Sequence, residues 1–369
     1  MRSQVKFLDL IHKRKPLAPH EGFIGLRADG ALRGSNGDID GEFTPFSPSS
    51  STFDGFGEFL FVPAAPLRPL LEEDGALEIT PLGNEVRVER GNITLTLGIF
   101  GEEYPPLVLP PRPGEEEGFG VEVPVEKAFL RSLGEAMRTV VRMAAQEGTG
   151  RPLFQGVQVE YGGAGFRVVA TDGYRLALKE LEAPEASQAL RAKEFSFLVP
   201  RKWVSGLAGL LEEGERGTLY PNGTGVGMVI EGDSWIARLY VRTIPGKLPP
   251  YEGLIPQGPW GCVTRFEAEE ALKALERLSP LSDEGKVRVF LGPEGLKLEV
   301  SGPYGGGEAL VEAKTEGTAS AFFLSEHLSD ALRGAKGEVE MKFLAESHST
   351  SPVLIESEGY KSLIVPLNK

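Results

Sequence analysis

The stretch Val157-Gln-Val-Glu-Tyr-Gly-Gly-Ala-Gly-Phe-Arg-Val-Val-Ala-Thr-Asp-Gly173 holds two alternating apolar and polar runs on either side of a glycine turn. Alternation with period two is typical of half-buried strands, so the stretch predicts a β-hairpin. The same plan occurs at 23–37 and at 287–302. The turn glycines recur at spacings of 165 − 30 = 135 and 295 − 165 = 130 residues, at Gly30, Gly165 and Gly295. Repeats of this length predict three copies of one domain, because solenoid units are only about 20 to 50 residues long.

A second landmark recurs in phase with the hairpins. The segments Phe59-Leu-Phe-Val-Pro63, Phe197-Leu-Val-Pro200 and Phe322-Phe-Leu-Ser325 each end a short apolar strand and begin a helix. Proline or serine suits such a start, because the first helical N–H groups have no partner within the helix. Two proline-rich segments, 104–110 and 248–256, are interpreted as linkers. The predicted domains are therefore 1–118, 119–256 and 257–369.

Hydrophobic periodicity predicts the helices of these domains. The clearest stripe places Phe129, Leu133 and Met137 on one side of a helix. The helices predicted in the second and third copies are Ala128–Gln146, Arg201–Glu213, Glu267–Leu278 and Glu326–Arg333. Runs such as 85–89 and 93–97 alternate with period two, as strands do. Each copy therefore contains helix, strands, helix and strands, and the predicted fold class is α+β.

The composition is that of a globular protein, because 41% of the 369 residues are hydrophobic and 25% are charged. No apolar run approaches the roughly 20 residues that are needed to cross a bilayer. The single cysteine, Cys262, excludes an intrachain disulfide, so we expect a cytoplasmic location. The formal net charge of −14 argues against a nucleic-acid-binding protein unless the basic residues gather on one surface.

Basic residues do gather on the predicted helices. Arg131, Arg138 and Arg142 stand at i, i+7 and i+11, which at about 100° per residue places them within roughly 40° of one another. Other basic residues open, line or close predicted helices, namely Lys13, Arg14, Lys15, Arg201, Lys202, Lys273, Arg277, Arg333 and Lys336. A single cluster of this kind is usually a solvated helix face. Its repetition in three copies favours a surface that follows the phosphates of double-stranded DNA without reading the bases.

The sequence argues against an enzyme. The four histidines are scattered, and none stands at a metal-ligand spacing. The segment Gly223-Thr-Gly-Val-Gly227 is rich in glycine, but it lies between predicted strands, so we do not expect a phosphate-binding loop. No general base or nucleophile accompanies Thr171-Asp172. We therefore predict no catalytic residues, no bound metal and no cofactor.

The segment Thr171-Asp-Gly-Tyr-Arg-Leu-Ala177 resembles the Ala-Thr-Asp-Gly-His-Arg-Leu-Ala signature of the bacterial DNA polymerase III beta subunit family, the DNA sliding clamps. The segments 249–256 and 351–367 are similar to that family's linker before its third domain and to its C-terminal strand. The resemblance implies three clamp domains, each with two helices packed on antiparallel sheet. It also implies a ring of two head-to-tail protomers, with the helices inside, that encircles double-stranded DNA as a non-enzymatic replication processivity factor.

The resemblance further implies the partners and their sites. A hydrophobic cleft would take short peptide motifs of DNA polymerase III and other proteins, and a separate clamp loader would open the ring using ATP. The cleft maps to Phe154, Thr171, Gly173, Tyr174, Arg175, Leu176, Pro249, Leu254, Leu363, Val365, Pro366 and Leu367. The homodimer interface maps to Ile93 and Leu95 on one side and to Pro280 and Leu281 on the other. The basic helix residues would line the central hole.

Three features depart from the family pattern. Glu326 stands where a tyrosine commonly borders the cleft, and the chain ends in Asn368-Lys369 where the family typically has arginine and an apolar residue. Only about 14 residues precede Lys15-Pro16, so the first helix is shorter than the family usually shows. The short first domain keeps a second hypothesis open, namely a clamp-like paralogue that regulates or competes with the standard replicative clamp.

Overall fold

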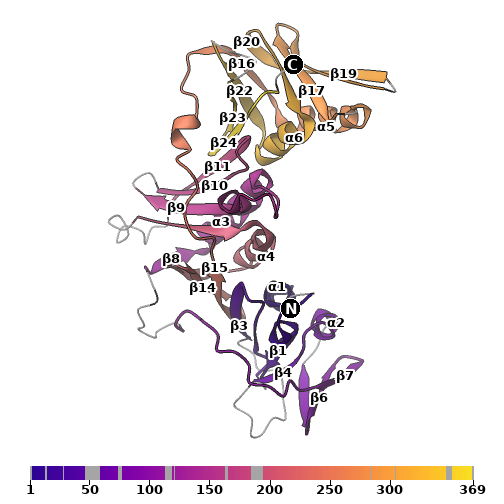
Figure 1. Cartoon of the computed structure of the whole chain (residues 1–369), viewed down its shortest axis with the longest axis vertical. Helices are drawn as coiled ribbons and strands as arrows, with labels where there is room; N and C mark the ends of the chain where they lie inside the picture. Colours follow the sequence, from indigo (N-terminus) through magenta and orange to yellow (C-terminus); the bar gives the residue numbers. More distant parts are fainter. Residues whose placement is uncertain are drawn as a thin grey trace. The chain divides into compact units, whose positions relative to one another are not determined.

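The computed structural model describes residues 2–12, 15–27, 29–45, 59–73, 77–112, 119, 121–162, 165–183, 194–282, 284–303, 305–345 and 351–367. The chain forms two compact units, each assembled from several segments (Figure 1). Unit one comprises Met1–Glu135, Tyr161–Ala164 and Glu182–Pro245, and unit two comprises Ala136–Glu160, Gly165–Leu181 and Gly246–Lys369. The division into three domains at 118 and 256 stays a prediction.

Unit one is organised by an antiparallel sheet of eight strands in the order β4-β1-β2-β3-β15-β14-β13-β8. Its strands are β1 (Phe23–Leu26), β2 (Leu32–Ser35), β3 (Ile39–Pro45), β4 (Leu60–Pro63), β8 (Val123–Glu126), β13 (Arg216–Pro221), β14 (Gly225–Gly232) and β15 (Trp235–Arg242). The pairing of β3 with β15 joins distant parts of the chain, because Ile39 lies opposite Val241. A separate sheet holds β5 (Glu78–Leu82), β6 (Glu85–Arg90) and β7 (Ile93–Gly98) in that order.

The helices of unit one bury the apolar stripes of their sequences. Helix α1 (Arg2–Ile11) buries Phe7 and Leu10 and packs on α4 (Arg201–Leu211), which follows β12 (Phe195–Pro200) directly. Gly206 of α4 allows this contact, since a Cβ there would lie 2.7 Å from Leu10 Cδ2. A larger residue at this position would require the Leu10 side chain to shift.

Unit two holds most of a second antiparallel sheet, in which the strands run in the order β9-β10-β11-β24-β23-β22-β16-β20. These strands are β9 (Gly156–Gly162), β10 (Gly165–Thr171), β11 (Arg175–Leu181), β16 (Trp260–Glu267), β20 (Lys314–Gly317), β22 (Glu338–Leu344), β23 (Val353–Ser357) and β24 (Tyr360–Ile364). A four-stranded sheet in the order β19-β18-β17-β21 holds β17 (Lys286–Gly292), β18 (Gly295–Gly302), β19 (Gly305–Val311) and β21 (Ala319–Leu324). The helices of this unit are α5 (Ala268–Leu278) and α6 (Ser325–Gly334), which pack on each other.

The predicted hairpins and fold class are confirmed, and one helix end is wrong. The turn glycines have left-handed φ angles of +79°, +99° and +118° at Gly30, Gly165 and Gly295. Helix α3 (Lys127–Val140) stops 146 − 140 = 6 residues before the predicted end, and a 3₁₀ turn follows it. The cause is local, because Ala144 is extended and Gly148 has a positive φ. A buried apolar run therefore continues past the helix without helical geometry.

Gly134 of α3 gives a test of the packing between α3 and α4. A Cβ at Gly134 would lie 2.9 Å from the Ala208 carbonyl oxygen, and a backbone atom cannot move without shifting its helix. We expect Gly134→Val to lower the free energy of unfolding by about 1–3 kcal/mol, as overpacking does in other cores. The matched control is Gly101→Val, because nothing lies within 4 Å of a Cβ there. Equal urea midpoints for the two variants would contradict this account of the packing.

Candidate functional site

Strands β11 and β24, from the middle and the end of the chain, are neighbours in the sheet of unit two. Leu176 lies opposite Leu363 in this antiparallel pair. Beyond the last pair, the Val365 N–H donates to the Tyr174 carbonyl at 3.1 Å. The two predicted cleft segments therefore form one continuous stretch of sheet.

The turn between β10 and β11 is fixed by its own side chains. Thr171 Oγ1 donates to the Arg175 carbonyl at 2.7 Å and accepts from the Gly173 N–H at 3.0 Å. One carboxylate oxygen of Asp172 accepts the N–H groups of Tyr174 and Arg175, at 2.9 and 3.0 Å. Gly173 has a φ of +94°, which residues with a Cβ rarely adopt. The signature sequence therefore encodes the shape of a turn that leaves Tyr174 59% exposed.

Apolar side chains surround this stretch of sheet. Phe154 lies beside the turn, since a Cβ at Gly173 would be 3.6 Å from its ring. The N–H of Leu367 donates to the Phe322 carbonyl at 2.7 Å, which ties the C-terminal segment to β21 of the four-stranded sheet. Val365 is exposed, whereas five other predicted cleft residues are buried, namely Thr171, Arg175, Leu176, Leu363 and Pro366.

The predicted linker residues Pro249 and Leu254 belong to a segment that is anchored on β9. The Leu248 N–H donates to Gln158 Oε1 at 2.7 Å, and the Tyr251 hydroxyl donates to the Glu160 carboxylate. Burial, together with that carboxylate, raises the pKa of Tyr251 above its ordinary value, so this hydroxyl stays a donor at neutral pH. The anchors leave Leu254 60% exposed, as a contact residue for a partner requires.

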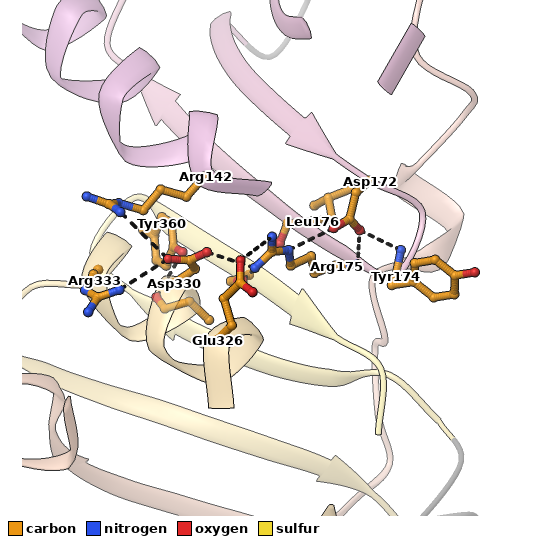
Figure 2. A network of polar contacts seen from close by, with 11 residues as sticks. Arg142, Asp172, Tyr174, Arg175, Leu176, Glu326, Asp330, Arg333 and Tyr360 are labelled. Atoms are coloured by element: carbon orange, nitrogen blue, oxygen red, sulfur yellow. Dashed lines mark hydrogen bonds and ion pairs between the residues drawn. The ribbon is translucent and has the colours of Figure 1, made fainter. Parts of the chain in front are cut away.

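Arg175 is the centre of a network of ion pairs beneath the turn (Figure 2). Its side chain is 8% exposed, and Nε donates to Asp172 Oδ2 at 2.9 Å. Nη1 donates to Asp330 Oδ2 on α6 at 2.8 Å, and Nη2 lies 3.6 Å from Glu326 Oε1. Arg175 therefore contacts a carboxylate of the turn and two carboxylates of the helix.

Asp330 is shared by three arginines. Its second oxygen, Oδ1, lies 3.5 Å from Arg333 Nη1 and 3.9 Å from Arg142 Nη1, while its side chain is 8% exposed (Figure 2). Burial, and next the charge of Arg175, lower the pKa of the neighbouring His327, which is therefore neutral at pH 7. The sequence analysis missed Asp330, because nothing in the local pattern of α6 distinguishes it from a solvated helical aspartate.

The predicted DNA-facing residues are mostly exposed, but several are paired with carboxylates. The exposed ones are Lys15, Arg131, Arg138, Arg142, Lys202, Lys273, Arg277, Arg333 and Lys336, whereas Arg201 is half-buried. Lys13 and Arg14 lie outside the described residues. The pairs are Lys202–Asp38 at 2.7 Å, Lys273–Glu269 at 2.6 Å and Arg333–Glu276 at 2.8 Å. A paired cation offers a phosphate less net charge, so these residues suit weak contact with DNA.

The predicted interface residues lie beside two sheet edges. Ile93 and Leu95 are half-buried on β7, the last strand of its sheet. Pro280 and Leu281 lie in the 3₁₀ turn after α5, and Leu281 is 42% exposed. This turn packs closely on the edge strand β19, since a Cβ at Gly307 would lie 2.9 Å from Leu281 Cδ1. Each edge is therefore accompanied by apolar side chains.

The part of the chain that the structure describes holds neither a metal-binding cluster nor a helix that could cross a membrane. Within that part of the chain, no group of three or more His, Cys, Asp or Glu side chains could hold a metal ion. Over the same residues, no helix combines the length and the apolar character that a membrane crossing needs. The glycine-rich segment at 223–227 contributes to the turn between β13 and β14 and to the start of β14.

Known proteins resemble this chain in sequence and in structure. The family model described as DNA polymerase III beta subunit, central domain, matches residues 131–241. The beta sliding clamp of Pseudomonas aeruginosa is 28% identical over 289 residues, which are 76% of this chain and 74% of the relative. The beta sliding clamp of Streptomyces coelicolor is 27% identical over 322 residues, which are 82% and 78% of the two chains. The crystal structure of the DNA polymerase III beta subunit of Thermotoga maritima matches with a TM-score of 0.82 at 20% identity, covers 100% of this chain and 97% of the other, and establishes the fold. Together these matches indicate the bacterial DNA polymerase III beta subunit family.

Proposed function

We propose that this chain is a DNA sliding clamp, a non-enzymatic processivity factor that encircles double-stranded DNA and tethers DNA polymerase. The pairing of β11 with β24 carries the proposal, because it brings the signature turn and the C-terminal segment, the two main parts of the predicted cleft, side by side. Relatives of similar sequence are named beta sliding clamps. This function requires three kinds of partner, namely DNA polymerase III, other proteins with short clamp-binding motifs, and a clamp loader. All of them would meet the chain in the cytoplasm.

The cleft suits a short linear motif with aromatic and aliphatic side chains. Tyr174, Val365 and Leu254 are exposed although they are apolar, and Phe154 and Leu367 are partly exposed. An extended peptide could bury these side chains with its own anchors, and the fixed turn and linker would lose little entropy on binding. Recognition of a linear motif would let many different proteins use one site.

The basic residues suit a contact with DNA that is weak and independent of sequence. Arg131, Arg138 and Arg142 are exposed along α3 and the turn after it. Several of the predicted DNA-facing cations, Arg142 among them, already lie near carboxylates, and this lowers the number of counterions that DNA binding can release. Retention on DNA would then come from the closed ring, and the weak contacts would allow sliding.

A three-domain chain can encircle a duplex by pairing head to tail with a second copy. We infer three clamp domains with boundaries near 118 and 256, each with two helices, namely α1 and α2 (Leu67–Glu72), α3 and α4, and α5 and α6. The edge strand β7 of one protomer would meet the edge strand β19 of its partner, with Leu95 and Leu281 at the seam. Such heterologous contacts close into a ring when the rotation between the protomers fits.

The first test concerns the cleft. We expect Phe154→Ala and Leu367→Ala each to reduce the binding free energy of a polymerase-derived Gln-Leu-x-Leu-Phe peptide by on the order of 1–3 kcal/mol, as for a buried apolar anchor. Fluorescence anisotropy with a labelled peptide measures the loss. Leu82→Ala is the matched control, because Leu82 is 50% exposed on β5 and outside the predicted cleft. Wild-type affinity in both cleft variants would show that the cleft lies elsewhere.

The second test concerns DNA. Replacing Arg131, Arg138 and Arg142 by Gln should weaken DNA association. It should also reduce the slope of log K against log salt concentration by at most about 2.7, since each phosphate contact contributes about 0.9 to that slope. The strand cations Arg87, Arg216 and Lys361, changed to Gln, are the control with the same loss of charge. Wild-type clamp loaded on nicked circular DNA should be released when the DNA is linearised. An unchanged slope would remove this helix from the DNA contact, and retention on linear DNA would contradict the ring.

The third test concerns assembly. We expect a homodimer that dissociates readily on dilution even though each protomer stays folded. The reason is that both helices supporting the first domain are short, since α1 has 10 residues and α2 only 6. Light scattering across a dilution series measures the dimer, and Leu281→Asp should shift it to monomer. A wild-type chain that stays monomeric at high concentration would contradict the ring and favour a paralogue that regulates or competes with the replicative clamp.

A further inference from the structure

Asp330 occupies an unusual place, because it is buried, charged and remote from every exposed cleft side chain in the sequence. Its Oδ2 accepts from Arg175 Nη1 at 2.8 Å across a separation of 155 residues. Both side chains are 8% exposed, so water cannot replace either partner easily. The pair therefore fixes the position of the Arg175 guanidinium relative to α6.

Arg175 transmits that position to both walls of the cleft. Its backbone N–H and its Nε both bond to Asp172, whose Oδ1 also accepts the Tyr174 N–H. The Arg175 backbone lies opposite Ile364 in the β11–β24 pair. One residue further along, the Val365 N–H donates to the Tyr174 carbonyl. A displaced guanidinium would therefore disturb the turn and the C-terminal segment together.

We propose that Asp330 is a positioning residue for partner binding, which acts through Arg175 on the turn that presents Tyr174 and on the segment that presents Val365. The inference rests on the proposed function of the cleft. Asp330 is itself buried, so we expect it to act without touching a partner. Its second oxygen faces Arg142 and Arg333, and this leaves Oδ2 for Arg175 (Figure 2).

The test is a double-mutant cycle on the full-length chain, with Asp330→Asn and Tyr174→Ala combined and a labelled Gln-Leu-x-Leu-Phe peptide as probe. We expect Asp330→Asn to lower the affinity for the peptide about tenfold, because the Arg175 guanidinium loses a buried charged partner. If Asp330 acts through the turn, the double variant should lose less affinity than the product of the two single losses. Independent, multiplicative losses would overturn the proposal, because a purely general loss of stability does not couple to one ring.

Hydrogen exchange gives a second readout that does not need the peptide. The amides of Tyr174 and Val365 should exchange faster in Asp330→Asn, while those of α5 keep their wild-type rates. Glu356→Gln is the matched control, because Glu356 is a part-buried carboxylate of the same unit that pairs with Lys342 and Lys361 on other strands. Unchanged exchange at the turn, or equal effects in Glu356→Gln, would overturn the proposal.

Two further outcomes keep the tests separate. Asp330→Glu keeps the charge and is expected to fold, so it replaces Asp330→Asn in both assays if the Asn variant unfolds. We expect the peptide affinity of Asp330→Glu to fall about threefold. A wild-type chain that fails to bind the peptide would contradict the proposed cleft. A wild-type chain that binds, with full affinity retained in Asp330→Asn and Asp330→Glu, would contradict the positioning role alone.

Discussion

The pairing of β11 with β24 is the constraint on which the rest of unit two depends. It joins Arg175 to Ile364 across 364 − 175 = 189 residues of sequence. The Ser362 hydroxyl donates to the Leu176 carbonyl at 3.0 Å within the buried sheet, so the pair is held by side-chain as well as backbone bonds. Because a slip of one residue would turn every side chain to the opposite face, this register decides which groups form the cleft.

A buried ion pair joins β11 to helix α6 at a cost in desolvation. In general, a buried pair adds little net stability over apolar residues of the same volume, whereas the loss of one partner costs about 3–5 kcal/mol. The Arg175–Asp330 pair therefore discriminates between arrangements more than it stabilises the fold. Any packing of α6 that separates the two side chains leaves an unpaired charge in the interior. Specificity of arrangement is what a pre-formed binding site requires.

The local structure could be predicted from the sequence far better than the distant pairings. Alternation and turn glycines predicted the hairpins around Gly30, Gly165 and Gly295, because strand and turn preferences act within a few residues. The end of α3 was missed, since the apolar stripe continues beyond Val140 while the backbone does not. Only the family resemblance implied that the signature turn and the C-terminal segment would lie together, and their register came from the structure, because no local pattern specifies which strands become neighbours.

The ion pairs of the predicted DNA-facing residues also divide into local pairs, which the sequence predicts, and distant pairs, which it does not. Glu269 and Lys273 stand at i and i+4 on α5, so their pair was within reach of helix geometry alone. The partners Asp38 of Lys202 and Glu276 of Arg333 come from other elements, and only the fold brings them together. These pairs lower the net positive charge that the basic helices present on an acidic chain of net charge −14. Exposed charges are screened beyond roughly 8–10 Å at physiological salt, so DNA at the basic helices would respond to the nearby cations and their carboxylates, and hardly to the acidic remainder of the chain.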